Sequence, residues 1–268
     1  MPLAATRSGA LHDAMHASPS ANDNAPLTTG KPKMFRIKIC GITNVEDAIA
    51  AVDAGADAIG LNFYEKSPRC VTPIDSWKIA ESLRTSFDRS VACVGLFVNH
   101  TYDEILEIRR RGPKWPIQLH GDEPPELLAR FGPQPTSPLS GPEWKIIRAR
   151  RFGDDGVAAI KADIEECARA GRLPDAVLLD AATPGRYGGT GESISWLGVA
   201  DHQRWLAGLP LILAGGLTPD NVAEAIRIVR PAAVDVASGV ESSPGRKDPV
   251  KVRDFVAAAT AAFESLES

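Results

Sequence analysis

Cys40 and Asp180 lie at the ends of two apolar segments, where one could act as a catalytic base and the other as a catalytic acid. Cys40 follows an apolar run at residues 35–39, and Asp180 ends another at residues 175–180. Lys38 shares a face of the first run with Cys40, and a nearby ammonium group would lower the pKa of the thiol. Partial burial would raise the pKa of the Asp180 carboxyl. The pair could therefore move protons on one substrate; a structural thiol and a capping or ion-paired carboxylate are the alternatives.

Two further side chains follow apolar runs and could bind a substrate. Arg69 comes after Ser67-Pro68 in an irregular loop, and its planar fork suits a carboxylate or a phosphate. A solvated surface arginine is the alternative. His120 ends the run at residues 116–120 and could be a ligand or a proton carrier, or a histidine satisfied by its neighbours.

Glycine-rich segments follow three apolar runs and indicate a phosphate site. Glycine lets backbone N–H groups approach an anion closely. The loops after the seventh and eighth strands of a (β/α)₈ barrel are the usual phosphate site, although tight turns alone would also need glycine. The residues concerned are Gly215, Gly216, Ser238 and Gly239, with Gly189 and Gly191 as further donors or parts of a mobile flap.

The elements that must position these residues alternate between strand and helix patterns. Apolar runs with little internal alternation are typical of parallel strands buried on both faces. We expect strands at residues 35–39, 57–63, 91–98, 116–120, 144–149, 175–180, 209–214 and 233–238. The clearest helical segments between and after them are residues 44–54, 75–84, 103–111, 220–229 and 250–264.

This alternation predicts an α/β fold, a single (β/α)₈ TIM barrel over residues 34–268. A doubly wound open sheet is the alternative, but its first turn would normally read GxGxxG, and residues 40–43 read CGIT. Residues 1–33 show no sustained apolar period and are expected to form a flexible, disordered extension, with an organelle transit peptide as the alternative. His12 and His16 in that segment are interpreted as solvated and not as a zinc pair.

Composition excludes several classes of protein. The 268 residues are 44% hydrophobic with a net charge of −4, which gives no bulk electrostatic reason to expect nucleic acid or an anionic membrane as a partner. No apolar run approaches the roughly 20 residues of a membrane helix. The four cysteines are widely spaced without a CxxC pair, which favours neither a zinc cluster nor a disulfide framework. They suit a reducing cytoplasm, where we expect the protein.

Taken together, the segments that carry these residues resemble the phosphoribosylanthranilate isomerase family. Each run is weak alone, but the set is specific because it occurs in order along the chain. The matching runs are KICGIT (38–43), SPR (67–69), VGLFVN (94–99), QLHGDE (118–123), LLD (178–180), GGTG (188–191), LAGGLTPDNV (213–222) and DVASGVE (235–241) followed by PGRKD (244–248).

The resemblance implies an aldose–ketose isomerase of the intramolecular oxidoreductase type. Its reaction is the Amadori rearrangement of N-(5'-phosphoribosyl)anthranilate to 1-(2-carboxyphenylamino)-1-deoxyribulose 5-phosphate in tryptophan biosynthesis. Asp180 would be the general acid and Cys40 the general base. Arg69 matches the arginine that holds the anthranilate carboxylate, and His120 matches a residue near the substrate. The glycine loops would bind the 5-phosphate. Neither metal nor organic cofactor is implied, and both a monomer and a homodimer remain open.

Two departures and two rival functions accompany this resemblance. The family commonly has Phe-Asp-Trp where this chain has Ile194-Ser195-Trp196, and a serine where it has Ala237. Indole-glycerol-phosphate synthase and ribulose-phosphate 3-epimerase share the phosphate loops, but this chain shows neither the Lys and Glu set of the first nor the metal ligands of the second. A phosphosugar-binding protein without turnover is the other rival, and it would need neither Cys40 nor Asp180.

Overall fold

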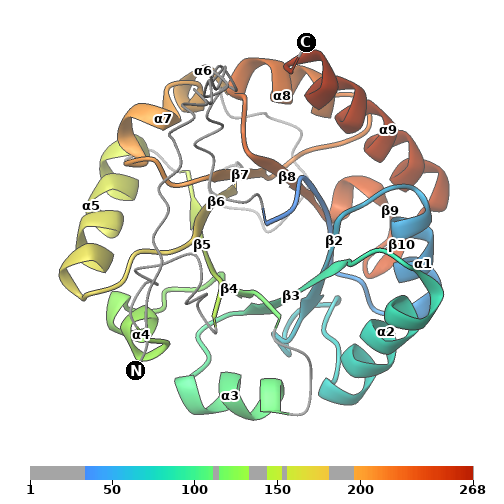
Figure 1. Ribbon diagram of the computed structural model, residues 1–268, viewed down its shortest axis with the longest axis horizontal. Helices are drawn as coiled ribbons and strands as arrows, with labels where there is room; N and C mark the ends of the chain where they lie inside the picture. The colour runs from blue at the N-terminus through green and yellow to red at the C-terminus, as the bar shows by residue number, and fades with distance from the viewer. Residues whose placement is uncertain (1–33, 111–114, 133–143, 153–155, 181–195, 268) are drawn as a thin grey trace, which may run out of the picture. The chain divides into compact units, whose positions relative to one another are not determined.

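The chain forms a closed barrel of eight parallel strands, β1 to β8, hydrogen-bonded in sequence order. Figure 1 shows these strands as an inner ring surrounded by helices. The computed structural model describes residues 34–110, 115–132, 144–152, 156–180 and 196–267. The expected (β/α)₈ architecture is confirmed, whereas the expected flexible extension at residues 1–33 lies outside the described residues. Within the described part of the chain, no helix is long and apolar enough to cross a bilayer.

All eight expected strands are present, with ends that differ by a few residues. β1 runs one residue beyond the expected end, so Cys40 belongs to the strand and does not follow it. β8 ends two residues early, and Ser238 instead begins a 3₁₀ turn, η1 (Ser238–Val240). The strands are β1 (Ile37–Cys40), β2 (Ala58–Asn62), β3 (Ala92–Phe97), β4 (Ile117–Leu119), β5 (Ile146–Arg151), β6 (Ala176–Asp180), β7 (Leu211–Ala214) and β8 (Ala233–Val236).

The helices pack outside the strands, and their starts follow local capping chemistry. The side chain of Asn44 accepts a hydrogen bond from the backbone N–H of Asp47 and so caps α1. The helices are α1 (Val45–Asp53), α2 (Pro73–Ser86), α3 (Tyr102–Arg110), α4 (Pro125–Arg130), α5 (Gly156–Arg169), α6 (Trp196–Val199), α7 (His202–Trp205), α8 (Val222–Val229) and α9 (Pro249–Ser265). A feature that the sequence patterns did not indicate lies between η1 and α9: a small antiparallel hairpin of β9 (Glu241–Ser243) and β10 (Arg246–Lys247).

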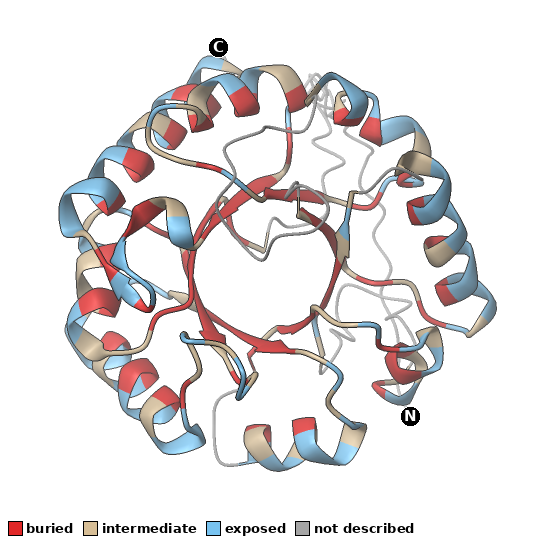
Figure 2. Cartoon of the chain, turned by 180° about the vertical axis from the view of Figure 1, so that it is seen from behind, coloured by how far each residue is buried: buried red, intermediate tan, exposed pale blue. Residues whose placement is uncertain are grey.

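Alternation along each strand divides the buried side chains between two cores. Ile37 and Ile39 pack with helix residues in the larger core between strands and helices. The alternate positions form a smaller core inside the barrel, with Val94, Ile147 and Leu178 among its members. Figure 2 shows the ring of strands as almost entirely buried. Because Lys38 and Cys40 alternate with Ile37 and Ile39, their side chains belong to the barrel interior.

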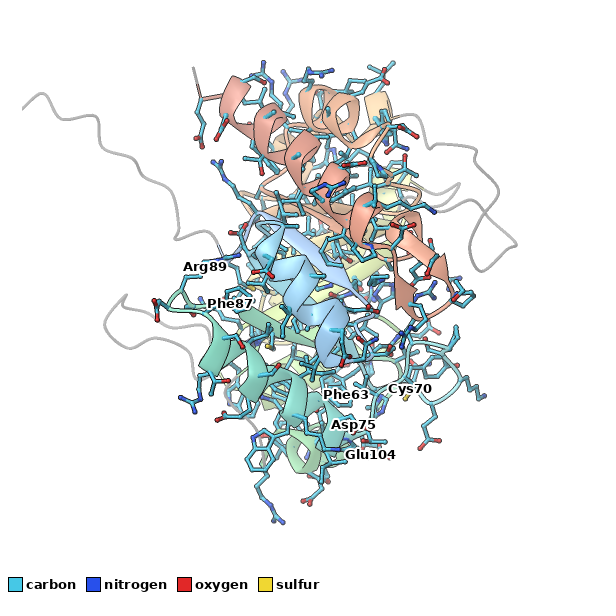
Figure 3. All side chains as sticks on the ribbon, turned by 90° about the vertical axis from the view of Figure 1, so that its right-hand side faces the viewer. Phe63, Cys70, Asp75, Phe87, Arg89 and Glu104 are labelled. Carbon is cyan, nitrogen blue, oxygen red and sulfur yellow. The ribbon has the colours of Figure 1, made fainter. Side chains whose placement is uncertain are left out.

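The two ends of the barrel carry different features. In Figure 3, Cys70 lies toward the carboxyl ends of the strands, whereas Phe87 and Arg89 lie at the opposite end. The Arg89 guanidinium donates there to the carbonyl oxygens of Val52, at 2.7 Å, and Ala56, at 2.9 Å, after α1. Both carbonyls lie in or just after the last turn of α1, where helix carbonyls lack an intrahelical partner from the next turn. The Arg89 side chain thus ties the segment after α2 to the end of α1 at the amino end of the barrel.

A partly buried ion-pair network ties β5 to α5. Arg148, with a side chain 2% exposed, donates from Nε and Nη2 to the two carboxylate oxygens of Asp163, both at 2.6 Å. Arg150 adds a third bond to Asp163 at 2.8 Å. Burial alone would raise the pKa of the Asp163 carboxyl, but the hydrogen bonds from Arg148 and Arg150 outweigh it, and the pKa lies below its ordinary value.

We expect Asp163→Asn to lower the free energy of unfolding by about 2 kcal/mol at neutral pH, because charge-assisted hydrogen bonds contribute roughly 1.5–3 kcal/mol each. The depressed folded-state pKa makes this contribution fully present above the unfolded pKa of about 4. It is lost as the pH falls through the lower folded value. Urea denaturation of both proteins from neutral pH down to about pH 2.5 measures the difference, and a difference that stayed constant throughout would contradict the prediction.

Candidate active site

The expected acid and base both stand at the carboxyl end of the barrel. Cys40 is the last residue of β1, and Asp180 is the last residue of β6. His120 directly follows β4. In the closed ring, β1 and β6 are separated by β7 and β8, so the thiol and the carboxyl approach the barrel mouth from well-separated strands. A ligand in the mouth could therefore meet them from different sides.

The Cys40 thiol is packed over a glycine and beside a buried ion pair. Its residue is 6% exposed, and a Cβ built on Gly60 of β2 would lie 2.6 Å from its Sγ and 3.1 Å from Cε of Lys38. The absence of a side chain at Gly60 thus leaves the space that the thiol and the lysine share. Lys38 Nζ donates to Oδ1 of Asp235 on β8 at 2.8 Å, with both side chains buried.

The pKa of Cys40 corrects one expectation. Lys38 does lower the pKa of the thiol, as the sequence suggested, and Lys247 adds to this effect. Burial and the negative charge of Asp235 act in the opposite direction and are stronger, so the pKa lies above its ordinary value. The sequence revealed the lysine two residues away, but not the carboxylate that the fold brings beside it. A thiol whose pKa lies above its ordinary value is protonated at neutral pH, so Cys40 needs further stabilisation of its thiolate to act as a base there.

Of the three other cysteines, which we expect to be structural, Cys93 and Cys167 are buried. All four cysteines are free. Burial raises the pKa of Cys93 to about 12 and is the main cause that raises the pKa of Cys167 to about 11. Cys70 is partly exposed, and its pKa is raised by burial and by the charge of Glu65. Among these thiols, Cys40 alone ends a strand at the barrel mouth.

His120 is held between a buried amide and the candidate acid. Gln118 lies on the same face of β4 and is fully buried, and its Nε2 is 2.8 Å from Nδ1 of His120. In this orientation the amide donates to Nδ1, so a neutral His120 carries its proton on Nε2. Nε2 faces Oδ2 of Asp180 at 3.8 Å, and about a quarter of each of these two side chains is exposed. The structure thus brings His120 and Asp180 together, with Gln118 as an orienting residue that the sequence patterns did not single out.

Arg69 is also at this end, and a carboxylate of the protein already holds one edge of its guanidinium. Nε and Nη2 donate to Oε1 and Oε2 of Glu241 on β9, both at 2.7 Å. Lys247 on β10 donates from Nζ to Oε1 of Glu241 at 3.0 Å. Glu241, Lys247 and Asp235 were not among the expected site residues. A signal existed, because isolated charges within apolar strands, such as Lys38 and Asp235, need a partner of opposite charge.

The loops after β7 and β8 pack against each other. Gly215 and Gly216 have φ values of 82° and 65°, the left-handed region that favours glycine. A Cβ on Gly239, next to Ser238 in η1, would lie 1.9 Å from the carbonyl oxygen of Leu217. The two expected phosphate loops are therefore in direct backbone contact at Gly239 and Leu217. The expected donors Gly189 and Gly191 lie outside the described residues, as does Ile194-Ser195, where the chain departs from the family pattern.

We expect Gly239→Ala to weaken the binding of a sugar phosphate at least tenfold, because the added methyl group must push the two loops apart. Calorimetric titration with ribose 5-phosphate measures the affinity. Gly171→Ala is the matched control: its φ of +94° imposes backbone strain, but nothing lies within 4 Å of the added Cβ. Equal loss of affinity in both variants would show that general destabilisation, and not loop contact, is responsible.

The described residues contain no group of three or more His, Cys, Asp and Glu side chains that could hold a metal ion. The chemistry visible at this end is instead a thiol and a carboxyl on separate strands, a half-satisfied guanidinium and a glycine surface. Such a set suits proton transfer on an anionic substrate.

Comparison with known proteins places these features in a family. The family model for N-(5'-phosphoribosyl)anthranilate isomerase matches residues 37–258. The enzyme of that name from Acidithiobacillus ferrooxidans is 46% identical over 224 residues, covering 84% of this chain and 97% of the relative. That from Trichlorobacter lovleyi is 43% identical over 223 residues, covering 83% and 97%. The crystal structure of the Thermotoga maritima isomerase superposes with a TM-score of 0.68 at 35% identity, covering 85% of this chain and all of that one.

Proposed function

The chain belongs to the N-(5'-phosphoribosyl)anthranilate isomerase family, and we propose that it performs the family's reaction with Cys40 as base and Asp180 as acid. The substrate is N-(5'-phosphoribosyl)anthranilate, and the reaction is a step of tryptophan biosynthesis. The product is 1-(2-carboxyphenylamino)-1-deoxyribulose 5-phosphate, an aldose-to-ketose change. The observation that carries the proposal is the placement of Cys40 and Asp180 at the ends of β1 and β6, at one mouth of the barrel.

The proposed mechanism has two proton transfers that involve Asp180 and Cys40, followed by a tautomerisation. Asp180 donates a proton to the ring oxygen while the nitrogen lone pair displaces that oxygen from C1, so that the furanose opens to an iminium ion. The Cys40 thiolate then removes the proton from C2. The electron pair of the C2–H bond forms a C1=C2 double bond, and the π pair of the C1=N bond moves to the nitrogen. The resulting enolamine tautomerises to the ketone. In the last step the C2 hydroxyl loses its proton and C1 gains one, so substrate and product are isomers and no oxidant or reductant is consumed.

The raised pKa of Cys40 fits a base that must attack a C–H bond. A thiolate with a higher pKa is a stronger base, although fewer molecules hold it at neutral pH. Lys38 and Lys247 both favour the thiolate, so its formation does not leave an isolated charge in the barrel.

The remaining residues would bind the two charged ends of the substrate. Arg69 is proposed to hold the anthranilate carboxylate, and the backbone of Gly215, Gly216 and Gly239 the 5-phosphate. His120 would contact the substrate beside Asp180, 3.8 Å away. One solved relative, 33% identical to this chain, is an isomerase in complex with reduced 1-(o-carboxyphenylamino)-1-deoxyribulose 5-phosphate, which carries both a carboxylate and a phosphate.

Turnover of phosphoribosylanthranilate, generated in situ from anthranilate and phosphoribosyl pyrophosphate, tests the proposed function. The substrate fluoresces, and we expect the wild-type protein to abolish the signal rapidly. Binding of the substrate without loss of fluorescence would instead support a phosphosugar-binding protein. Sedimentation of the same sample decides between monomer and homodimer, since the related isomerase from Thermotoga maritima is dimeric and has also been solved as monomers.

Deletion of residues 1–32 is expected to leave turnover unchanged within about twofold, because the family match begins only at residue 37. The measurement is kcat/KM of the shortened chain in the same fluorescence assay. An unfolded or inactive product would show that the segment belongs to the catalytic domain, and the proposed division into residues 1–33 and 34–268 would be wrong.

A further inference from the structure

The β9–β10 hairpin holds the guanidinium of Arg69 through two hydrogen bonds to Glu241. We propose that Glu241 is a positioning residue: it occupies the Nε–Nη2 edge of the Arg69 guanidinium and so presents the Nη1–Nη2 edge to the aryl carboxylate of the substrate. The hairpin would thereby make the site selective for an N-aryl substrate that carries this carboxylate. The inference rests on the proposed function and assigns a role that the reaction itself does not require.

The contact between Arg69 and Glu241 uses one full edge of the guanidinium. Both bonds are 2.7 Å long, and each carboxylate oxygen receives one of them. A guanidinium has five N–H groups, so three remain, and they include the pair at the Nη1–Nη2 edge. Within the described residues, the hydrogen bonds of the Arg69 guanidinium involve only Nε and Nη2, with Glu241. The remaining edge has the geometry for a second bidentate carboxylate.

Glu241 is itself fixed by a second cation. Its side chain is 5% exposed, and Lys247 Nζ, whose side chain is 1% exposed, donates to Oε1 at 3.0 Å. Lys247 also donates to the carbonyl oxygen of Ala237 at 3.0 Å. One carboxylate thus lies between two cations, and the cluster keeps a net positive charge that favours an incoming anion.

The aliphatic part of the Arg69 side chain and the loop that carries it are also held by close contacts. A Cβ on Gly41 would lie 2.4 Å from Cδ of Arg69, so the stem passes directly over that glycine, next to Cys40. A Cβ on Gly245, in the β9–β10 turn, would lie 2.7 Å from the carbonyl oxygen of Pro68. Thr43 Oγ1 donates to the carbonyl oxygen of Gly245 at 2.7 Å. The hairpin, the β1 loop and the Arg69 loop are therefore packed together as one unit.

The ionisation of Glu241 supports a lasting pair. Burial alone would raise the pKa of this carboxyl, but hydrogen bonds and charges from Arg69 and Lys247 outweigh it, and the pKa lies below its ordinary value. The carboxylate is thus charged across the neutral range. A fixed arginine has already lost much of the side-chain freedom that binding would otherwise remove, roughly 0.5–1.5 kcal/mol per immobilised side chain. Such preorganisation strengthens recognition of the carboxylate specifically.

Two ligands that differ by one group test the inference. The first is reduced 1-(2-carboxyphenylamino)-1-deoxyribulose 5-phosphate, and the second is its phenylamino counterpart without the carboxyl group. We expect the wild-type protein to prefer the first about a hundredfold, and Glu241→Gln to reduce this ratio to below about tenfold. The affinity of Glu241→Gln for the second ligand should stay within about threefold of the wild-type value. For the natural substrate, KM should rise more than kcat falls.

Control variants separate positioning from general stability. Asp163→Asn removes a partly buried carboxylate charge that also pairs with two cations, but between β5 and α5. It should keep the wild-type ratio. Glu241→Asp keeps the charge on a shorter stem and should restore part of the ratio. Glu241→Gln leaves the Lys247 ammonium without its carboxylate partner. The double variant Glu241→Gln with Lys247→Met removes that ammonium as well, and its ratio of ligand affinities should equal that of Glu241→Gln.

The outcomes decide between the claims. A Glu241→Gln protein that keeps the hundredfold ratio, or that loses affinity for both ligands equally, would overturn the positioning role. If every Glu241 variant fails to fold, the pair is structural and the inference is also overturned. Absence of turnover by the wild-type protein would contradict the proposed function instead, because the ratio of the two ligands is measured by binding alone.

Discussion

Replacing Cys40 by serine is expected to lower kcat/KM at least a hundredfold, and Asp180→Asn is expected to do the same. A hydroxyl group in the place of the thiol stays protonated throughout the neutral range and cannot accept the proton from C2. An amide in the place of the carboxyl cannot donate a proton to the ring oxygen. A hundredfold loss corresponds to roughly 2.7 kcal/mol of transition-state stabilisation.

The fluorescence assay measures both variants, with Cys70→Ser as the matched control. Cys70 is a partly exposed thiol next to Arg69 in the chain, and the same chemical change there should leave the rate within about twofold of the wild type. Circular dichroism confirms that each variant is folded. A folded Cys40→Ser protein with near-normal kcat/KM would exclude the thiolate as the base, and the same result for Asp180→Asn would exclude the carboxyl as the acid.

The pH dependence of the wild-type rate gives an independent check. The pKa of Cys40 is raised by burial and by Asp235, so the thiolate is the minor form at neutral pH. On the alkaline-rising part of the pH profile, kcat/KM depends on the fraction of Cys40 that is thiolate. We expect it to rise about tenfold per pH unit until the thiol titrates, above its ordinary pKa of about 8.5. If the part of the pH profile that disappears in Cys40→Ser has its midpoint below that value, Lys38 and Lys247 lower the pKa of Cys40 by more than burial and Asp235 raise it.

Lys38→Met is expected to lower the free energy of unfolding by about 3–5 kcal/mol, because it leaves Asp235 as a buried charge without its partner. The lysine side chain is 0% exposed and the aspartate 7%, so water cannot replace the lost contact. Urea denaturation measures the loss. The double variant Lys38→Met with Asp235→Leu removes both charges and should recover most of the stability. Equal destabilisation of the single and double variants would mean that packing, and not charge, is responsible.

The pKa of Lys38 determines how the stability contribution of the Lys38–Asp235 pair changes with pH. Burial alone would lower the pKa of this lysine, but the charges of Asp235 and Cys40 outweigh it, and the pKa is raised. The contribution of the pair is therefore fully present below the ordinary lysine pKa of about 10.4 and is lost only as the pH rises through the higher folded value. At neutral pH the whole effect of the mutation should be seen.

Local sequence patterns predicted the barrel and placed Cys40 and Asp180 at the ends of its strands, but not the contacts around them. The strands are short apolar runs, so their number and order could be read along the chain, and Cys40 and Asp180 stand out as reactive groups at their ends. Asp235 pairs with Lys38 across 197 positions of sequence, and Arg69 pairs with Glu241 across 172. No local pattern specifies such partners. This is why the expected direction of the Cys40 pKa shift was wrong and why the hairpin was missed.

The ion pair between Lys38 and Asp235 also has a consequence for how the chain is made. The two residues are register partners on β1 and β8, the strands that close the ring. During synthesis Lys38 leaves the ribosome long before Asp235 exists. Until then a closed interior around Lys38 would bury an uncompensated ammonium group, which is strongly unfavourable. A nascent chain that lacks β8 is therefore expected to remain open at β1, and closure becomes a late step that only a nearly complete chain can take.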